Sequence, residues 1–405
     1  MPEGPEVRRA AAALDDALAG REIRAFSTRI KTARAWLREH GGTDTDEGAA
    51  FVGRRIARVR SHGKWLWGEA APTGAAAAPE ASGGPALGGE TLYFASHFLM
   101  WGRWYVVAPD DELAMTRDKR ERARIEVDGA VAVLTTAPKF AVGTGDPCAE
   151  DGPLAHLGPD TLPYEGPEAF DVDAFHDRLL SGEHHERTLG AVLLDQTVLA
   201  GVGNYLRAEI LHACRLDPWM TVGELTPDAL ACLDREIPAV CAFAYAHGGR
   251  TITDEEVETM RANPDLHYGE PHEWNLKHRI FRRTNLACLV CGDTVRQKKQ
   301  VTRRWVDGDG EPQEKRRPIY FCPTCQNTSV ELKPVRKTRK TKASGAKAPA
   351  ANAPAANAPA AKAPSAAAVP ARTTSPRAKA PASKASGAKA PRPSAKPPSS
   401  APADA

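Results

Sequence analysis

Residues 193–211 read LLDQTVLAGVGNYLRAEIL and hold two apolar helical patterns on either side of a short break at residues 200–204. The break contains two glycines and is too short for a strand, so we predict a helical hairpin whose second helix begins near Asn204. The first backbone N–H groups of a helix have no partner inside it and can bind a phosphate. An ordinary helical hairpin explains the same pattern, and the stretch alone leaves both interpretations open. Helical patterns surround it from about residue 171 to 247.

The chain before this element is dominated by short strand patterns. Residues 5–19 predict one helix, because their apolar residues share a face. Residues 54–69, 91–108 and 122–136 then predict strands that alternate with turns. The segment between the first two, residues 70–90, has the composition of a solvent loop. We therefore predict a β-domain introduced by a single helix.

Four of the eight cysteines form two Cys-x2-Cys pairs. Cys288 and Cys291 make up the first pair, and Cys322 and Cys325 make up the second. Two such pairs predict a closed four-thiolate site for one structural zinc ion. The other four cysteines are scattered singly, which predicts reduced thiols in the core of a protein from a reducing cytosol. They are Cys148, Cys214, Cys232 and Cys241.

The segment between the two cysteine pairs predicts a β-hairpin. Residues 295–306 (VRQKKQVTRRWV) and 315–322 (KRRPIYFC) read as strands on either side of an Asp-Gly turn. Both strands carry Lys and Arg, so a zinc-anchored hairpin of this kind is a candidate nucleic-acid finger.

Charge is distributed unevenly along the 405 residues. The net charge is +3, but the stretch from Lys333 to the end holds fifteen Lys/Arg and one acid, Asp404. The tail is otherwise mainly Ala, Pro and Ser, so we predict that it is disordered. It is either a passive solubilising segment or a flexible polycation that holds the protein near nucleic acid. We find neither a signal peptide nor an apolar run of about twenty residues, so we expect no export and no membrane span.

The first nine residues, MPEGPEVRR, place a proline directly after the initiator Met. If the Met is removed, Pro2 carries a free α-amino group, whose ordinary pKa of about 8 leaves a useful nucleophilic fraction at neutral pH. Proline is also favoured in the first turn of a helix. The residue alone does not separate these interpretations.

Taken in order, these features resemble the formamidopyrimidine-DNA glycosylase and endonuclease VIII family over roughly residues 2–330. The resemblance implies an α+β fold with four parts: an N-terminal catalytic β-sandwich domain with a leading helix at 2–160, a helix–two-turns–helix DNA-binding domain at 161–275, a four-cysteine zinc finger at 276–330 and a disordered basic tail at 331–405. The matching stretches are PEGPEVRRA, SHGKWLW, SHFLMWGRW, HLGPDTL, LLDQTVLAGVGNYLRAEIL and RPIYFCPTC.

The resemblance also implies the chemistry. The Pro2 amine would attack C1′ of the damaged nucleotide, displace the base and form a Schiff base, and β- and then δ-elimination would cut the strand. Glu3 would transfer protons during opening of the sugar ring. Lys64 would act electrostatically and as a proton donor near the phosphate and sugar. Asn204 and Arg317 would bind the phosphate near the lesion.

The finger departs from the family pattern, because the loop between its cysteine pairs is longer than usual. Arg317 precedes Pro-x-Tyr-x-Cys and is the preferred phosphate ligand, with Arg303, Arg304 and Arg316 as rivals. Two acids are candidates for positioning roles. Glu6 either orients the site or complements the dipole of the first helix, and Glu209 matches a family acid on the helix after Asn204.

A base flipped out of the duplex leaves a gap that inserted side chains can fill. Leu99, Met100 and Trp101 fall where the endonuclease VIII branch places this wedge. We expect strand alternation to bury at least one of the three, and Met100 is the preferred wedge residue.

The branch is indicated by TAPKFAVG at residues 136–143, which lacks the Asp-Pro-Arg-Arg-Phe-Gly loop of the 8-oxoguanine-specific branch. The resemblance therefore implies a monomeric endonuclease VIII-like enzyme of the bacterial cytosol and nucleoid, acting on double-stranded DNA with oxidised (above all pyrimidine) or abasic lesions. Two alternatives remain open: a non-catalytic damaged-DNA-binding protein, and a lyase that cuts abasic sites with little base excision.

Overall fold

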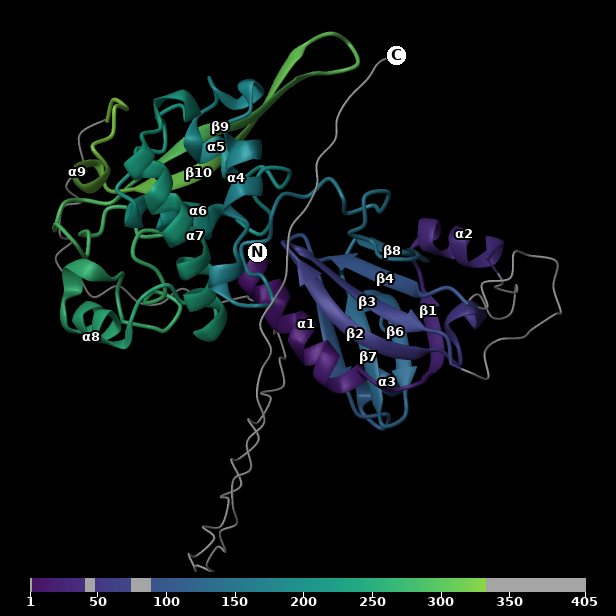
Figure 1. Cartoon of the computed structure of the whole chain (residues 1–405). Helices are drawn as coiled ribbons and strands as arrows, with labels where there is room; N and C mark the ends of the chain where they lie inside the picture. Colours follow the sequence, from purple (N-terminus) through teal and green to yellow (C-terminus); the bar gives the residue numbers. More distant parts are fainter. Residues whose placement is uncertain (1, 41–47, 74–88, 333–405) are drawn as a thin grey trace, which may run out of the picture. The chain divides into compact units, whose positions relative to one another are not determined.

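The computed structural model describes residues 2–40, 48–73 and 89–332 (Figure 1). Most of the predicted loop at 70–90 and nearly all of the predicted tail at 331–405 lie outside the described residues. Within the described residues no helix has the length and apolar character needed to cross a membrane.

The N-terminal part is built around a leading helix and two four-stranded antiparallel sheets (Figure 1). Helix α1 (Gly4–Leu18) agrees with the predicted helix over residues 5–19. The first sheet has the order β1 (Ile23–Thr28), β6 (Glu121–Val127), β7 (Ala130–Thr135) and β5 (Arg103–Val107). The second has the order β2 (Arg55–His62), β3 (Trp65–Ala71), β4 (Leu92–His97) and β8 (Lys139–Thr144).

The two sheets and α1 share one hydrophobic core, as in a β-sandwich. Leu14 and Leu18 of α1 are buried together with Phe26 of the first sheet and Phe94 of the second. Apolar residues one helical turn apart on α1 therefore cover the sandwich.

Two helices in this part were not predicted. They are α2 (Lys31–Glu39) and the single turn α3 (Glu112–Met115). Ala33, Trp36 and Leu37 of α2 lie at helical spacing, and Ala33 and Leu37 are buried, so this stretch carries a helical pattern that the prediction overlooked. The prediction of strands alone after the first helix is therefore corrected.

The C-terminal part is helical, as predicted, up to the finger. Its helices are α4 (Val172–Leu179), α5 (Leu189–Val192), α6 (Asn204–Ala213), α7 (Pro227–Ala246) and α8 (Asp254–Ala262). One short 3-10 turn lies in the N-terminal part, at Ala49–Phe51. Those of the C-terminal part are at Pro167–Ala169, Gly182–His184, Val222–Glu224 and Pro264–Leu266.

The first half of the helical hairpin predicted around residues 200–204 differs from the prediction. Helix α6 begins at Asn204 as expected, but α5 is only one turn long. Asp195 accepts hydrogen bonds from the backbone N–H (3.3 Å) and the hydroxyl (2.8 Å) of Thr197. Such local side-chain bonds compete with helical ones, and the chain after α5 consists of turns.

The finger is a two-stranded ribbon, as predicted. Strands β9 (Arg296–Val306) and β10 (Pro312–Phe321) are antiparallel, and the short helix α9 (Pro323–Gln326) follows. The ribbon packs against α5 through β9 and against α6 through β10. The finger is thereby fixed to the two helices that flank the break at residues 200–204.

The prediction that the scattered cysteines are all reduced is wrong for two of them. Cys214 and Cys232 form a disulfide with their Cα atoms 5.7 Å apart, which joins the end of α6 to α7. The two residues are separated by 18 positions. Sequence spacing alone gives no indication of this pairing, because it depends on how the two helices pack. Cys148 and Cys241 are free.

Candidate active site and metal centre

The carboxylate of Glu3 lies at the first turn of α6. It accepts hydrogen bonds from the backbone N–H groups of Gly203 (2.8 Å), Tyr205 (3.0 Å) and Leu206 (3.2 Å). A carboxylate at a helix N-terminus satisfies donors that have no partner inside the helix. The residue after Pro2 is therefore fixed to the break that the sequence singled out.

Glu3 is buried, with 2% of its surface exposed. Burial raises the pKa of its carboxyl from 4.5 to about 7, although Lys64 and the backbone N–H groups of Tyr205 and Leu206 favour the ionised form. A carboxyl with a pKa near neutrality can both give and accept a proton at physiological pH.

Glu6 orients the start of α1. Its carboxylate accepts a hydrogen bond from the backbone N–H of Glu3 (2.8 Å) and another from the hydroxyl of Tyr205 (3.1 Å). The backbone N–H of Gly4 also bonds to the carbonyl of Gly201 (2.9 Å). The bonds to Tyr205 and Gly201 hold the N-terminal residues against the helical part.

Lys64 lies in the two-residue turn between β2 and β3. Its Nζ donates a hydrogen bond to the carbonyl of Val202 (2.5 Å). Burial lowers the pKa of Lys64 from 10.5 to about 8, partly opposed by Glu3, while Arg317 and Arg207 lower it further. The lysine therefore reaches the same break as Glu3.

Gly63 brings this turn close to the break. Its φ of +55° is a left-handed conformation that β-branched and bulky residues avoid. A Cβ atom there would lie 2.7 Å from the Cβ of Ala200 and 2.9 Å from the backbone N of Gly201. Both the conformation and the close approach require glycine.

Arg207 is a site residue that the sequence analysis missed. It is fully buried, and its guanidinium donates to the Asn204 Oδ1 (3.2 Å) and to the carbonyls of Pro318 (2.9 Å) and Gly190 (2.6 Å). It also donates to the Gln300 Oε1 on β9 (3.1 Å). Arg207 therefore links Asn204 to the strand that carries Arg317. The spacing of Asn204 and Arg207, one helical turn apart, was the available signal.

A groove of about 1010 Å³ lies beside these residues, and its walls include Lys64, Asn204 and Arg317. Eight of its lining residues are lysines or arginines and three are carboxylates, so the groove favours a polyanion. Arg303, Arg304 and Arg316 line it as well. The geometry thus brings the predicted phosphate ligand and all its rivals to one groove.

The predicted wedge residues lie in the turn between β4 and β5. Leu99, Met100 and Trp101 are 40%, 57% and 76% exposed. The expectation that one of them is buried is wrong, because a turn has no strand alternation. Among the described residues, none of the three lines the groove at Lys64.

The wedge turn has a specific support. Leu99 has a φ of +50°, unusual for a large side chain, and its backbone N–H donates to the Nδ1 of His97 (3.1 Å). Burial lowers the pKa of His97 to about 4, and Lys139 and Lys64 lower it further. The ring is therefore neutral at physiological pH and can accept this bond.

Glu209 lies outside this constellation. It is buried and accepts hydrogen bonds from the hydroxyl of Thr251 (2.8 Å) and from the backbone N–H groups of Arg279, Ile280 and Phe281 (2.8–2.9 Å). These bonds anchor the chain that leads to the first cysteine pair.

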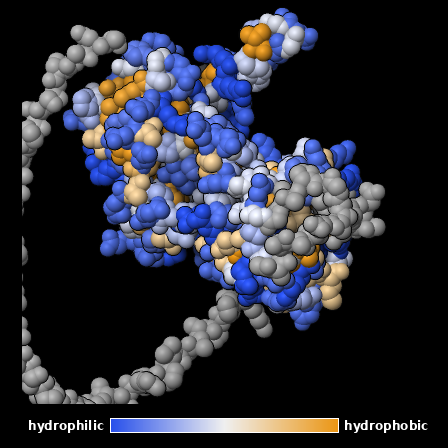
Figure 2. Space-filling model, turned by 45° about the vertical axis from the view of Figure 1, so that its right-hand side comes forward, coloured by the Kyte–Doolittle hydropathy of each residue, from blue (hydrophilic) through white to orange (hydrophobic). Residues whose placement is uncertain are grey.

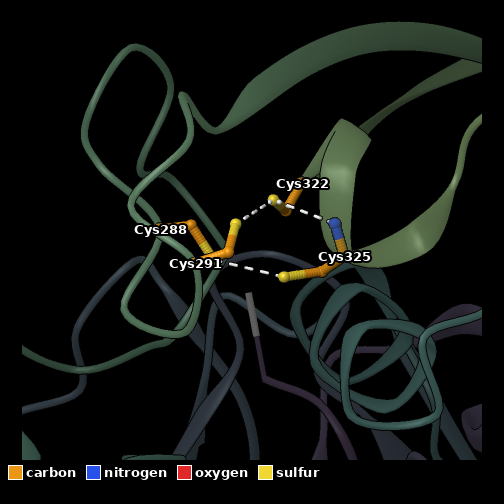
Figure 3. Close-up of side chains that lie close together, drawn as sticks. All are labelled: Cys288, Cys291, Cys322 and Cys325. Carbon is orange, nitrogen blue, oxygen red and sulfur yellow. Dashed lines mark hydrogen bonds between the residues drawn. The ribbon is translucent and has the colours of Figure 1, made fainter.

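The four paired cysteines gather in one cluster, shown in Figure 3. The Sγ atoms of Cys291 and Cys322 are 3.4 Å apart, and those of Cys288 and Cys325 are 3.8 Å apart. Four thiolates around a tetrahedral zinc, each about 2.3 Å from it, are separated by about 3.8 Å. The cluster therefore fits a metal ion held by four thiolates.

His212 of α6 is a neighbour of this cluster that the sequence analysis missed. Its Nε2 lies 3.6 Å from the Sγ of Cys288. A hydrogen bond to a metal-bound thiolate is a common way to orient it. Helix α6 thus begins at the Glu3 carboxylate and ends beside the cysteine cluster.

The sequence matches the N-terminal domain of formamidopyrimidine-DNA glycosylases over residues 1–141 and their H2TH domain over residues 157–256. A protein of Streptomyces coelicolor named probable endonuclease 8 2 is 30% identical over 333 residues, which cover 80% of this chain and 94% of that protein. The chain belongs to the formamidopyrimidine-DNA glycosylase and endonuclease 8 family. Endonuclease 8 of Pectobacterium atrosepticum is 28% identical over 81% of this chain and 100% of its own length.

Solved structures of the family share the fold. The Lactococcus lactis Fpg protein in complex with DNA containing N7-benzyl-Fapy-dG aligns with a TM-score of 0.55 and 19% identity, over 80% of this chain and 99% of that one. The complex of the same protein with abasic-site DNA gives the same values. At 19% identity, the similarity to these structures shows a shared fold.

The predicted family, its endonuclease VIII-like branch and the fold class are confirmed. Members of the family are DNA glycosylases that also cut at abasic sites, and this chain is such a bifunctional enzyme of base excision repair. The alternative of a non-catalytic damaged-DNA-binding protein is thereby set aside.

Proposed function

We propose that this glycosylase removes oxidised pyrimidines from double-stranded DNA with the amine of Pro2 as its nucleophile. The supporting observation is the convergence at residues 202–206. Glu3, next to the nucleophile, binds the backbone there, Lys64 bonds to Val202, and Asn204 opens α6. Segments from three distant parts of the sequence thus meet beside a basic groove.

The reaction begins once Met1, which lies outside the described residues, has been removed. The Pro2 nitrogen attacks C1′, and the glycosidic bond breaks with its electron pair leaving on the base, which takes up a proton. The C1′–O4′ bond then opens as the nitrogen forms an iminium ion with C1′. The iminium acidifies C2′, and loss of a C2′ proton expels the 3′ phosphate. A second elimination expels the 5′ phosphate.

Glu3 and Lys64 supply the proton transfer and the positive charge. With a pKa of about 7, Glu3 can protonate O4′ as the sugar ring opens, because a sizeable protonated fraction exists at neutral pH. With a pKa of about 8, Lys64 remains mostly cationic at neutral pH, and its charge attracts the phosphates next to the lesion. Glu6 positions Glu3 through the backbone bond described above.

Asn204 and Arg317 are proposed to bind the phosphate near the lesion. Asn204 occupies the first turn of a helix, where backbone N–H groups favour an anion, and Arg317 faces the same groove. Leu99, Met100 and Trp101 are proposed to fill the gap that the flipped nucleotide leaves. They form an exposed apolar turn, and apolar side chains can insert between the steps of a base stack.

We further propose that the metal at the four cysteines is one structural zinc ion. A site of four thiolates has no open position for a reactant, so the ion would fix the finger without entering the chemistry. The ends of the domains are proposed at residues 160, 275 and 330. The enzyme is proposed to act as a monomer in the bacterial cytosol, where its DNA substrate lies.

Borohydride trapping tests this proposal. Borohydride reduces the iminium to a stable amine and leaves the protein joined to the DNA. Duplexes containing thymine glycol, 8-oxoguanine or an abasic site are compared, and the cross-linked peptide is sequenced. We expect a Pro2 adduct with thymine glycol exceeding that with 8-oxoguanine. Trapping on the abasic duplex alone would favour the alternative of a lyase with little base excision.

An alanine inserted between Met1 and Pro2 provides the matched control. The insertion converts the Pro2 nitrogen into an amide while every other residue is kept. It should abolish the Pro2 adduct and leave binding of undamaged duplex unchanged. A full-length active protein that retains Met1 would contradict the proposal.

A further inference from the structure

The disulfide between Cys214 and Cys232 joins the end of one helix to the beginning of another. Cys214 caps the C-terminal end of α6, and Cys232 lies in the second turn of α7. We call residues 215–231, which the bond closes into a ring, the disulfide loop. Both cysteines are only half-buried. In the cytosol, where the enzyme is proposed to act, a disulfide is usually transient and redox-sensing rather than permanent.

A cation lies beside one of the two sulfur atoms. Arg235 follows Cys232 by about one turn of α7, and its Nη2 donates a hydrogen bond to the Cys232 Sγ (3.3 Å). The Nε of the same guanidinium donates to Glu236 (3.0 Å), which holds the side chain along the helix surface. A neighbouring guanidinium stabilises a thiolate, and a stabilised thiolate leaves a disulfide faster. Cys232 is therefore the better leaving group of the pair.

The disulfide loop holds the chain around the second cysteine pair of the finger. The carbonyl of Leu216 accepts a hydrogen bond from the Gln326 Nε2 (2.8 Å). The Oε1 of Gln326 in turn accepts from the backbone N–H of Cys322 (2.9 Å). The carboxylate of Asp217 accepts from both the backbone N–H and the hydroxyl of Ser329 (2.8 Å each). The loop thus contacts the finger on both sides of α9.

The same loop also supports the strands of the finger. The carbonyl of Pro218 accepts a hydrogen bond from the Gln300 Nε2 on β9 (2.7 Å), and Gln300 bonds to the buried Arg207. The ring of Trp219 packs edge-on against Phe321 of β10, with centroids 4.9 Å apart. In Figure 1 and Figure 2 the outer part of the β9–β10 ribbon projects from the molecule. Contacts at its base therefore determine where the finger lies.

We propose that Cys214 and Cys232 form a redox site, at which exchange with a low-molecular-weight thiol sets how firmly the disulfide loop holds the finger. A donor thiolate attacks the Cys214 Sγ, and the bond between the two cysteines breaks with its electron pair leaving on Cys232. A second donor thiolate attacks the sulfur of the first donor and releases Cys214. The two donors become one disulfide, and the cysteines take up their two protons. Exchange with a low-molecular-weight disulfide runs the same steps in reverse.

The closed form is the one that fixes the finger. A disulfide restricts the unfolded chain and so stabilises the elements that it joins. Opening the pair leaves the disulfide loop tied to the finger but no longer to α7 through this bond. Oxidising conditions, which produce the lesions of the proposed substrate, therefore favour the form of the enzyme that binds DNA more tightly. Only this last consequence rests on the proposed function.

Equilibration of the full-length protein with mixtures of reduced and oxidised glutathione tests the redox site. Differential alkylation and mass spectrometry of the peptides measure the thiol content of Cys214 and Cys232 separately from that of the other cysteines. We expect the pair to open and close reversibly in the folded protein, without denaturant. A pair that stays closed in excess reduced glutathione until the protein unfolds would overturn the inference. A pair that stays open in excess oxidised glutathione would overturn it as well.

Arg235→Gln tests the assignment of the leaving group. With an uncharged thiol such as 2-mercaptoethanol, this variant should open more slowly than the parent, while its closed form should unfold at the same temperature. Arg261→Gln is the matched control, because it removes an arginine of α8 that is paired with Glu258 and lies away from either cysteine in the sequence. Equal opening rates in the two variants would contradict the role of Arg235.

Thermal unfolding, transfer of the bound metal to a chelator and affinity for a duplex measure the coupling to the finger. Opening the pair should lower the unfolding midpoint by about 5–10 °C, the shift expected from a closed loop of this size. It should also speed metal release and weaken DNA binding. Cys232→Ser should behave like the open parent in every redox buffer, and Cys148→Ser should keep the response of the parent. Open and closed forms that agree in all three measurements would refute the coupling.

Failure of this inference can be told apart from failure of the proposed function. A protein that exchanges the pair and changes its metal release, but gives no borohydride adduct, would contradict the proposed chemistry and leave the redox site standing. Normal trapping together with a pair that does not respond to glutathione would have the reverse meaning.

Discussion

Glu3 and Gly203 are two hundred positions apart and are joined by a hydrogen bond of 2.8 Å from the backbone N–H of Gly203 to the carboxylate of Glu3. A Cβ atom at position 203 would lie 2.3 Å from the Glu3 Cδ. The carboxylate therefore occupies the space that a side chain at 203 would fill.

Glu3→Gln should impair base excision more than cleavage at abasic sites. A glutamine cannot protonate O4′, whereas an abasic sugar already exists partly as the open aldehyde. We expect a loss of about 100-fold or more in the single-turnover excision rate, the usual scale of general acid catalysis. Because burial raises the pKa of Glu3 to about 7, the protonated acid is lost above that pH, and the parent rate should fall there. A Glu3→Gln profile that keeps this fall would assign it to another group.

Gly63→Ala should displace Lys64 from Val202. The added Cβ meets the Cβ of Ala200, and φ is +55°. Strain of this kind costs about 1–3 kcal/mol of folding free energy. We expect a lower midpoint of thermal unfolding and, in addition, slower excision. Gly53→Ala is the control, because its φ is +81° but nothing lies within 4 Å of the added atom. If both variants lost activity equally, close approach at Gly63 would not matter.

Arg207→Met should weaken DNA binding through Asn204 and Arg317, neither of which is altered. The substitution leaves the carbonyls of Gly190 and Pro318 without their donor, at a cost of about 1–3 kcal/mol each when buried. We expect a higher KM and a lower unfolding temperature. Arg207→Lys keeps the charge but loses the planar fork, and should restore stability only in part. An unchanged KM in both variants would limit Arg207 to the fold.

Cys322→Ser should lower the metal content and weaken DNA binding, because formation of a metal site is coupled to local folding. The chemical step on saturating lesion DNA should change little. Elemental analysis and binding titrations measure the two effects, and Cys148→Ser serves as the control because Cys148 lies outside the cluster. Full zinc content in Cys322→Ser would contradict the four-thiolate site.

His97→Phe should loosen the wedge turn by removing the acceptor for the backbone N–H of Leu99. Excision from a paired duplex should slow by about 5- to 10-fold, the effect of roughly 1 kcal/mol for one hydrogen bond. Cleavage of a single-stranded abasic substrate, which needs no wedge, should be unaffected. His97→Asn should retain activity, since Asn accepts from the residue two positions on. Slower cleavage of the single strand would point to a defect elsewhere.

Local signals predicted most of the fold. The helix at α1, the start of α6 at Asn204, the β9–β10 ribbon and the cysteine cluster all follow from short-range pattern or spacing. The length of α5 was not predictable in this way, because the Asp195 turn overrides an apolar pattern.

The candidate site depends more than the fold does on contacts between residues that are far apart in the sequence. Short sequence motifs indicated Glu3, Lys64 and Asn204, but not the buried contacts that join them. Arg207 was missed because an arginine on a helix is usually solvated, and only the packed structure shows it between Asn204 and Pro318. The disulfide between Cys214 and Cys232 was missed because it also depends on how distant residues pack in the folded chain.

The pairing of Glu3 with Gly203 also sets an order of events during synthesis. The N-terminal residues leave the ribosome first, yet the backbone that holds Glu3 follows only after two hundred further residues. A nascent chain that stops before Val202 therefore exposes the proline without the groups that would activate it. Contacts of such long range slow folding as well. The end of the protein that carries the proposed nucleophile is thus incomplete until about half of the polypeptide has been made.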